Sequence, residues 1–175
     1  SSFLRGSAAA PPLIRQALWS PSGNSFTENG ADLTGLTDAG DLPLSDTPAK
    51  ARDQIQLGIG ALLASGFQPI ALGGDHSITY PILRALITQH PTLTILHIDA
   101  HGDVYDEFDG DRYSHACPFA RILEECTGVT LVQAGIRTLT PHQREQVAKF
   151  GVNCLEMRHL ASGARPAIDG PVYVS

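Results

Sequence analysis

The chain has 175 residues, of which 42% are hydrophobic and 17% are charged, and its formal net charge is -6. This length predicts one compact domain with a sizeable core, because two full domains would need a longer chain. Lys and Arg total only 12 and form no cluster. The composition therefore argues against nucleic acid or an anionic membrane as a partner, and a small molecule is the expected ligand.

Cysteine usage and the N-terminal segment bear on where the protein works. Three cysteines without C-x-x-C spacing predict neither a disulfide framework nor a zinc knuckle. No apolar run approaches the roughly 18 residues of a membrane span, and residues 1–16 lack the basic-then-apolar order of a signal peptide. We therefore expect a cytoplasmic protein with no membrane partner. Because the chain begins with Ser1 rather than Met, we also expect its natural start to lie upstream.

The first elements follow from apolar spacing and turn residues. Apolar residues at helical spacing predict a helix over 9–19, with Pro12 in its first turn. Residues 20–47 are rich in turn formers and predict irregular surface with at most one short strand. Helical spacing returns over 52–66, and the short apolar run over 69–74 predicts a strand that leads into a glycine turn.

The same alternation continues to the end of the chain. Residues 77–90 predict a helix, with Ser77 as its N-cap and Pro81 in or near the first turn. The later elements are a strand over 93–99, a helix over 116–126, a strand over 129–137, a helix over 141–151, a strand over 152–157 and a last strand over 171–175. Continuous apolar strands separated by helices are typical of a parallel sheet with helices on both faces. We predict an α/β fold with three layers, α/β/α.

Two polar clusters follow predicted strands of this sheet. GGDHS, residues 73–77, comes after one strand, and DAHGD, residues 99–103, comes after the next strand along the chain. Ligands of open parallel sheets bind outside the carboxyl ends of the strands, where the loops converge. The clusters therefore mark the expected functional site.

The residue types of these clusters suit a metal ion. Asp99, His101 and Asp103 alternate along the chain, so their side chains share one side while the backbone stays extended. Carboxylate and imidazole ligands without thiolate suit Mn(II), Fe(II), Co(II) or Zn(II). Taken alone, Asp99 could cap the following loop, and His76 could simply pack at a helix start. Two such clusters at neighbouring strand ends favour the metal site.

GGDHS and DAHGDVYD resemble the two metal motifs of the ureohydrolase family, which includes arginases and agmatinases. The resemblance extends to YSHACPFARILEE, VQAGIR and REQVAKFGVNCLEMR, in the family's order, and it is strongest to the plant-type arginases. It implies the family's arginase-like fold and a binuclear manganese enzyme that hydrolyses a guanidino compound to urea and an amine. The plant-type resemblance favours L-arginine as substrate, with agmatine and 4-guanidinobutyrate as alternatives. It also implies a homo-oligomer, either a trimer or a hexamer.

The resemblance also assigns roles to individual residues. It implies that His76 and Asp103 hold one manganese ion, that His101 holds the other and that Asp99 bridges them. His115 lies at the position of the family's proton-shuttling histidine. His97, inside an apolar strand, is instead expected to be a hydrogen-bonded core residue.

The chain departs from the family pattern at its end. Ser175 lies where the family continues into S-x-D-x-D-x-x-D-P, whose first two aspartates complete the metal pair. We therefore expect these residues to be the N-terminal and central portion of a single incomplete domain that cannot complete the chemistry alone.

Two alternatives of other classes stay open at this point. DAHGDVYD contains the D-x-H and G-D-x-x-D fragments of binuclear metallophosphoesterases, although the fragments overlap and no G-N-H motif follows. The chain could also be a catalytically incomplete metal-binding scaffold.

Overall fold

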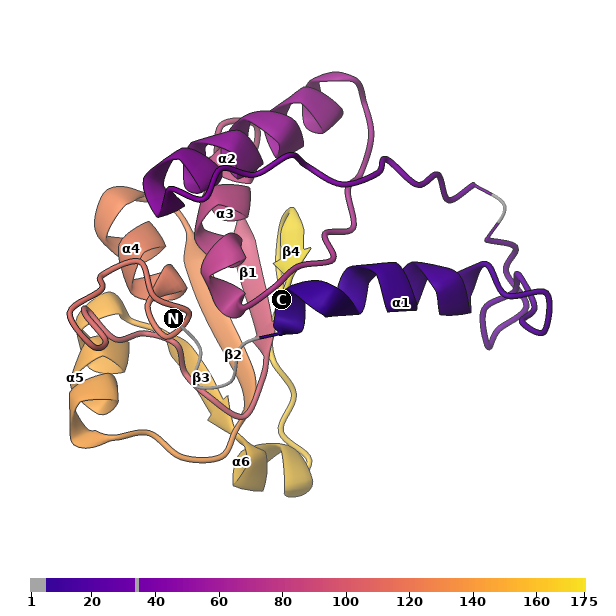
Figure 1. Cartoon of the computed structure of the whole chain (residues 1–175). Helices are drawn as coiled ribbons and strands as arrows, with labels where there is room; N and C mark the ends of the chain where they lie inside the picture. The colour runs from indigo at the N-terminus through magenta and orange to yellow at the C-terminus, as the bar shows by residue number, and fades with distance from the viewer. Residues whose placement is uncertain (1–5, 34) are drawn as a thin grey trace.

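The computed structural model describes residues 6–33 and 35–175, which are arranged around a parallel sheet (Figure 1). Its strands are β1 (Thr94–Ile98), β2 (Thr130–Ile136), β3 (Asn153–Glu156) and β4 (Val172–Val174). They pair in the order β3-β2-β1-β4, and every pairing is parallel. The predicted parallel sheet is confirmed.

The helices join the strands and flank the sheet. They are the 3-10 helices η1 (Ser7–Ala9) and η2 (His76–Ile78) and the α-helices α1 (Ala10–Leu18), α2 (Pro48–Ala64), α3 (Thr79–Ile87), α4 (Pro118–Glu125), α5 (Pro141–Phe150) and α6 (Met157–Ala161). Among the described residues, no helix has the length and apolarity needed to cross a bilayer. The predicted α/β class with flanking helices is confirmed.

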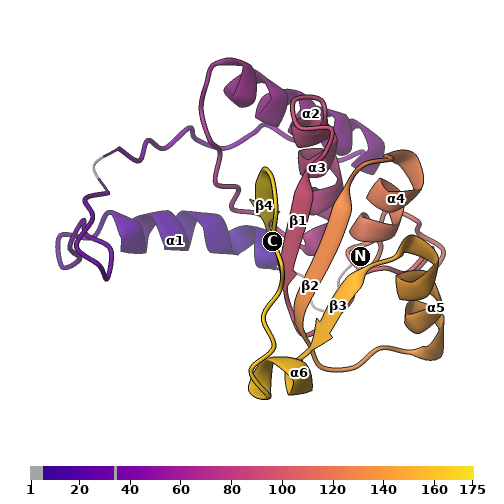
Figure 2. The same cartoon turned by 180° about the vertical axis from the view of Figure 1, so that it is seen from behind.

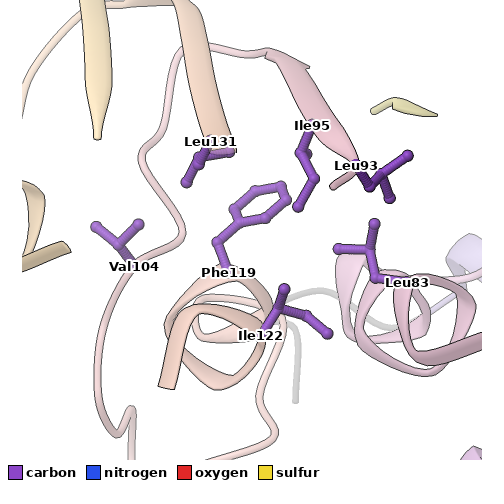
Figure 3. Close-up of a cluster of buried hydrophobic side chains, with 7 residues drawn as sticks. All are labelled: Leu83, Leu93, Ile95, Val104, Phe119, Ile122 and Leu131. Atoms are coloured by element: carbon purple, nitrogen blue, oxygen red, sulfur yellow. The ribbon is translucent and has the colours of Figure 1, made fainter. Parts of the chain in front are cut away.

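The main core lies between one face of the sheet and the helices α3 and α4 (Figure 3). In β1 and β2 the register sets Ile95 beside Leu131, and both side chains point to this face. The buried members of the cluster are Leu83, Leu93, Ile95, Val104, Phe119, Ile122 and Leu131. Each fully buried side chain of this size contributes roughly 1.5–3 kcal/mol relative to an exposed one. This cluster holds the loop after β1 against the rest of the fold through Val104.

A second core cluster joins α2 to α3. Ile55 and Ile59 of α2 pack with Ile82 and Ala85 of α3. The spacing of four residues in α2 and three in α3 places each pair on one face of its helix. The helix α2 thus forms an outer cover over α3.

The opposite face of the sheet is only partly covered. Figure 2 shows the strands from this side, in front of α3 and α4. The helix α6 contacts β2 and β3, and Val132 of β2 is 1% exposed. Ile98 of β1 and Val174 of β4 are 61% and 60% exposed. The helical layer on this face therefore covers only part of the sheet.

The first helix and the segment after it follow the prediction. Pro11 and Pro12 occupy the first turn of α1, where their missing N–H groups cost nothing. The helix projects from the sheet (Figure 1), and its Leu13 and Ile14 are exposed. The following described residues are irregular apart from an isolated bridge between Phe26 and Asp32.

Two predictions about elements need correction, and one short helix was missed. Residues 69–74 do not form a strand, because no described strand pairs with them and a strand needs a hydrogen-bonding neighbour; Ile70 is accordingly 75% exposed. The N-cap is Asp75 instead of Ser77, since the Asp75 carboxylate accepts the Ser77 N–H at 3.1 Å. The short helix α6 was not predicted, because a single turn carries too little periodicity.

Candidate metal centre

The candidate centre lies at the carboxyl end of β1. The Ile98 N–H donates to the carbonyl of Ser175, at the end of β4, over 2.8 Å. The Asp99 N–H donates to the carbonyl of Ala134 in β2 over 3.2 Å. The turn that carries Asp99, His101 and Asp103 therefore begins at the end of β1, as predicted, whereas the cluster over 73–77 does not follow a strand.

His76 and Asp103 form the first half of the centre. Nδ1 of His76 lies 2.6 Å from Oδ2 of Asp103, and its Nε2 lies 2.9 Å from Oγ of Ser175. His76 is fixed at the start of η2 by the Asp75 cap. The side chains of His76 and Asp103 are 24% and 12% exposed, so the pair is mostly shielded from water. The structure thus brings together two residues that, by the family resemblance, are expected to hold one metal ion.

An unusual backbone conformation aims Asp103 at His76. Its φ of +47° lies in the left-handed region, which is uncommon for residues other than glycine but which aspartate tolerates better than most. The preceding Gly102 is packed tightly, since a Cβ atom there would lie 2.8 Å from Cδ2 of Leu139. The chain therefore curls sharply after His101 and turns Asp103 back towards η2.

Asp99 and His101 form the second half of the centre. Oδ1 of Asp99 accepts the His101 N–H at 2.8 Å and lies 3.1 Å from Nδ1 of the same residue. Burial has the largest single effect on the pKa of Asp99, and it acts to raise this pKa because it favours the neutral carboxyl. The His101 N–H and the nearby histidines outweigh it and lower the pKa of Asp99. Asp99 is therefore an anion at neutral pH, whereas His101 presents a side chain that is 69% exposed.

His97 lies next to both His76 and Asp99. Its expected role as a core residue did not predict this position. Its ring centroid is 5.3 Å from that of His76, and its Nε2 is 3.8 Å from Oδ2 of Asp99. Nδ1 contacts Gln133 at 3.1 Å, but Nε2 has no hydrogen-bond partner among the described residues. The sequence did hold a signal for this location, because His97 lies two residues before Asp99 and therefore on the same side of the strand.

Burial keeps His97 neutral. The side chain is 1% exposed and packs on Phe119 with ring centroids 4.5 Å apart. Burial, followed by the neighbouring His76, lowers the pKa of His97 to about 4. One ligand atom each of His76, His97 and Asp103 lies within 4.8 Å of the other two.

The candidate catalytic residue His115 lies on the loop that follows Asp103. This loop is closed by a hydrogen bond from the Tyr105 N–H to the Ala116 carbonyl over 3.0 Å. Nδ1 of His115 lies 3.3 Å from Oγ of Ser114, and its ring meets Phe108 edge-on at 5.6 Å. The loop is tied to α5, because Tyr105 stacks on His142 at 5.6 Å. His115 is thus held by a loop that starts within the centre.

The donor set fits a divalent cation. Imidazole nitrogens and carboxylate oxygens converge here, and this combination suits Mn(II), Fe(II), Co(II) or Zn(II). Cys117, the N-cap residue of α4, is not a candidate ligand, because metals bind the thiolate. Burial and then the carboxylates of Asp111, Asp106 and Asp103 raise the pKa of Cys117 to about 12.

Comparison with known proteins identifies the family. The model of the Arginase family matches residues 1–175. The chain belongs to the arginase family. It is 42% identical over 183 residues to an arginase of Glycine max, and the match covers 97% of this chain and 51% of that protein. The arginase-family chain thus spans about half the length of this curated relative.

Two further relatives show how broad the similarity is. The structure of an arginase from Medicago truncatula superposes with a TM-score of 0.79 at 40% identity, covering 89% of this chain and 52% of that one. An agmatinase of Bacillus anthracis is 28% identical over 179 residues, which cover 99% of this chain and 62% of that protein. The predicted arginase-like fold is confirmed, and membership of the arginase family argues against the metallophosphoesterase alternative.

Proposed function

We propose that the protein is a binuclear manganese ureohydrolase that hydrolyses L-arginine to urea and ornithine. The observation that carries this proposal is the meeting of two histidine–carboxylate pairs, His76 with Asp103 and Asp99 with His101, at the carboxyl end of β1. In the proposed centre, His76 and Asp103 would hold one manganese ion, His101 would hold the other, and Asp99 would be a ligand of both. The greater similarity to the plant arginase than to the agmatinase supports arginine as the substrate.

The chemistry demands a strong nucleophile beside a cationic substrate. A guanidinium group has a pKa of about 12.5 to 13.8 and is stabilised by resonance, so neutral water attacks it poorly. Bound divalent metals lower the pKa of water towards about 7 and so make hydroxide available near neutral pH. Asp99 suits the bridging role because its lowered pKa keeps it ionised. The ionised carboxylates also offset the positive charge of the metals and the substrate.

We assign proton transfer to His115. The amine that leaves when urea is released must gain a proton, and histidine is the side chain most often used to donate one near neutral pH. The contacts of His115 with Ser114 and Phe108 would orient its ring, while the link of Tyr105 to His142 would anchor the loop beside the centre.

Urea release tests the proposal. The full-length protein is loaded with Mn(II) and assayed with L-arginine, agmatine and 4-guanidinobutyrate. We expect L-arginine to give the highest kcat/KM, His101→Ala to abolish urea release, and His159→Ala, on exposed α6, to retain it. Preference for agmatine would replace the arginine assignment. No urea from any substrate, in protein that binds two manganese ions, would support the scaffold alternative instead. Cytoplasmic location and a trimeric or hexameric assembly stay predictions.

A further inference from the structure

Gln133 is a fully buried polar residue that faces the candidate centre. It lies in the middle of β2 with 0% exposure, and the register of the parallel pair sets it beside His97 of β1. Its Nε2 lies 2.5 Å from the carbonyl oxygen of Gly102 and 3.1 Å from Nδ1 of His97. One side-chain amide therefore contacts both the strand and the turn that carry the candidate ligands.

The contact with Gly102 fixes the orientation of the amide. A carbonyl oxygen only accepts hydrogen bonds, so the Gln133 nitrogen, and not its oxygen, must face Gly102. The same nitrogen then donates to Nδ1 of His97, which must accept. A neutral imidazole carries one proton, and that proton is consequently on Nε2.

The proton on Nε2 decides what His97 can do. Nε2 lies 3.8 Å from Oδ2 of Asp99, and His97 belongs to the group in which ligand atoms of His76, His97 and Asp103 lie within 4.8 Å of one another. A ring nitrogen that carries a proton has no lone pair for a metal. With the opposite tautomer, Nε2 would offer a third protein ligand beside His76 and Asp103.

We propose that Gln133 is a positioning residue that holds the Gly102 turn and keeps the proton of His97 on Nε2, the nitrogen that faces Asp99, and so excludes His97 from the metal ligands. The metal part of this inference rests on the proposed function. The turn has little freedom to shift, because Gly102 is also packed against Leu139. Outer partners of this kind set ligand orientation in metal sites, and losing one typically lowers metal affinity about 10- to 100-fold.

The first test reads the tautomer of His97 without any metal. Long-range ¹H–¹⁵N correlation spectra of metal-free protein with ¹⁵N-labelled histidine distinguish a protonated ring nitrogen from a bare one. We expect the wild-type proton on Nε2. In Gln133→Glu it should move to Nδ1, because an ionised carboxylate only accepts, and a protonated one must use its single O–H for the Gly102 carbonyl.

Gln146→Glu is the matched control, because Gln146 is also a buried glutamine, at 5% exposure. It should leave the His97 signals unchanged. A proton on Nδ1 in the wild type would overturn the inference without reference to any variant. A Gln133→Glu variant that folds and keeps the His97 proton on Nε2 would also overturn the inference.

The second test separates donor from ligand by Mn(II) affinity, measured from the electron paramagnetic resonance of free Mn(II). His97→Gln keeps an N–H donor near the position of Nε2 and should bind Mn(II) within about threefold of the wild type, whereas His76→Gln should lose at least tenfold. Gln133→Met should lose about 10- to 100-fold, and Gln146→Met should stay within about twofold. Equal losses in His97→Gln and His76→Gln would make His97 a ligand and overturn the inference. Absence of Mn(II) binding in the wild type would contradict the proposed function, while the tautomer spectra would still decide the role of Gln133.

Discussion

Nδ1 of His76 lies 2.6 Å from Oδ2 of Asp103, although 27 positions separate the two residues in the sequence. The helix α3 carries the chain from His76 to the start of β1, and β1 returns it to the same edge of the sheet. The left-handed backbone of Asp103 then turns its carboxylate back to the imidazole. The contact joins two groups that the proposed centre assigns to one cation.

Asp103→Asn should weaken Mn(II) binding at least tenfold. The substitution removes the anionic ligand, while asparagine tolerates a positive φ nearly as well as aspartate, so the backbone should keep its course. Asp109→Asn is the matched control, because Asp109 also has a positive φ of +52° and is exposed. Isothermal titration with Mn(II) should separate the two variants. Equal affinity in both would argue that Asp103 is not a ligand.

Phe119→Ala should destabilise the fold by about 3–5 kcal/mol, because it opens a cavity in the main core. Phe119 is 0% exposed, and its ring contacts both His97 and His76. Urea unfolding followed by circular dichroism measures the loss. Leu57→Ala, in an exposed position of α2 at 72%, should change the free energy of unfolding by less than about 0.5 kcal/mol. A loss below 1 kcal/mol for Phe119→Ala would contradict the packing described here.

Local signals in the sequence predict most of the elements. The helix α5 begins at Pro141 because Thr140 and Gln143 form a capping box, and it ends because Gly151 adopts the left-handed conformation that stops a helix. Strand prediction over 69–74 was wrong because strand formation depends on a pairing neighbour. Such a neighbour is a non-local feature, which the apolar character of these residues does not reveal.

The candidate site shows the same division between local and non-local information. Asp99, His101 and Asp103 could be grouped from their alternate spacing, since they lie on one short stretch. The contact between His97 and Gln133 spans 36 positions and depends on the register of β1 and β2. The sequence does not fix that register, so Gln133 could not be recognised as part of the site.

The raised pKa of Cys117 should make stability fall at high pH. Burial, then the carboxylates of Asp111, Asp106 and Asp103, raises this pKa to about 12. Above the ordinary thiol pKa near 8.5, the unfolded chain therefore loses a proton that the folded protein keeps. The stabilisation of the folded protein that comes from Cys117 is therefore fully present below about pH 8.5 and is lost as the pH rises towards 12. The difference in unfolding free energy between wild type and Cys117→Ala should shrink over this window.

Iodoacetamide labelling gives an independent check of the same residue. At pH 8.5 in the native protein, Cys117 should react far more slowly than Cys126, which is only partly buried. Mass spectrometry of the digested protein locates the label. Comparable labelling of both cysteines would show that the Cys117 thiol is neither buried nor protonated as described.

His115→Asn should lower kcat for L-arginine by about 10²- to 10⁴-fold, the usual contribution of a general acid. Mn(II) affinity and KM should change little, because the proposed role of His115 is proton transfer. His159→Asn, on exposed α6, should keep full activity. A His115→Asn variant with wild-type kcat would remove this residue from the mechanism.

The metal centre itself is tested most directly by anomalous diffraction at the manganese edge, from crystals of the full-length protein grown with Mn(II). We expect two anomalous peaks at the carboxyl end of β1. One should contact His76 and Asp103, the other should contact His101, and Asp99 should touch both. Manganese bound elsewhere, or no peak beside these residues in crystals grown at saturating Mn(II), would contradict the proposed metal centre.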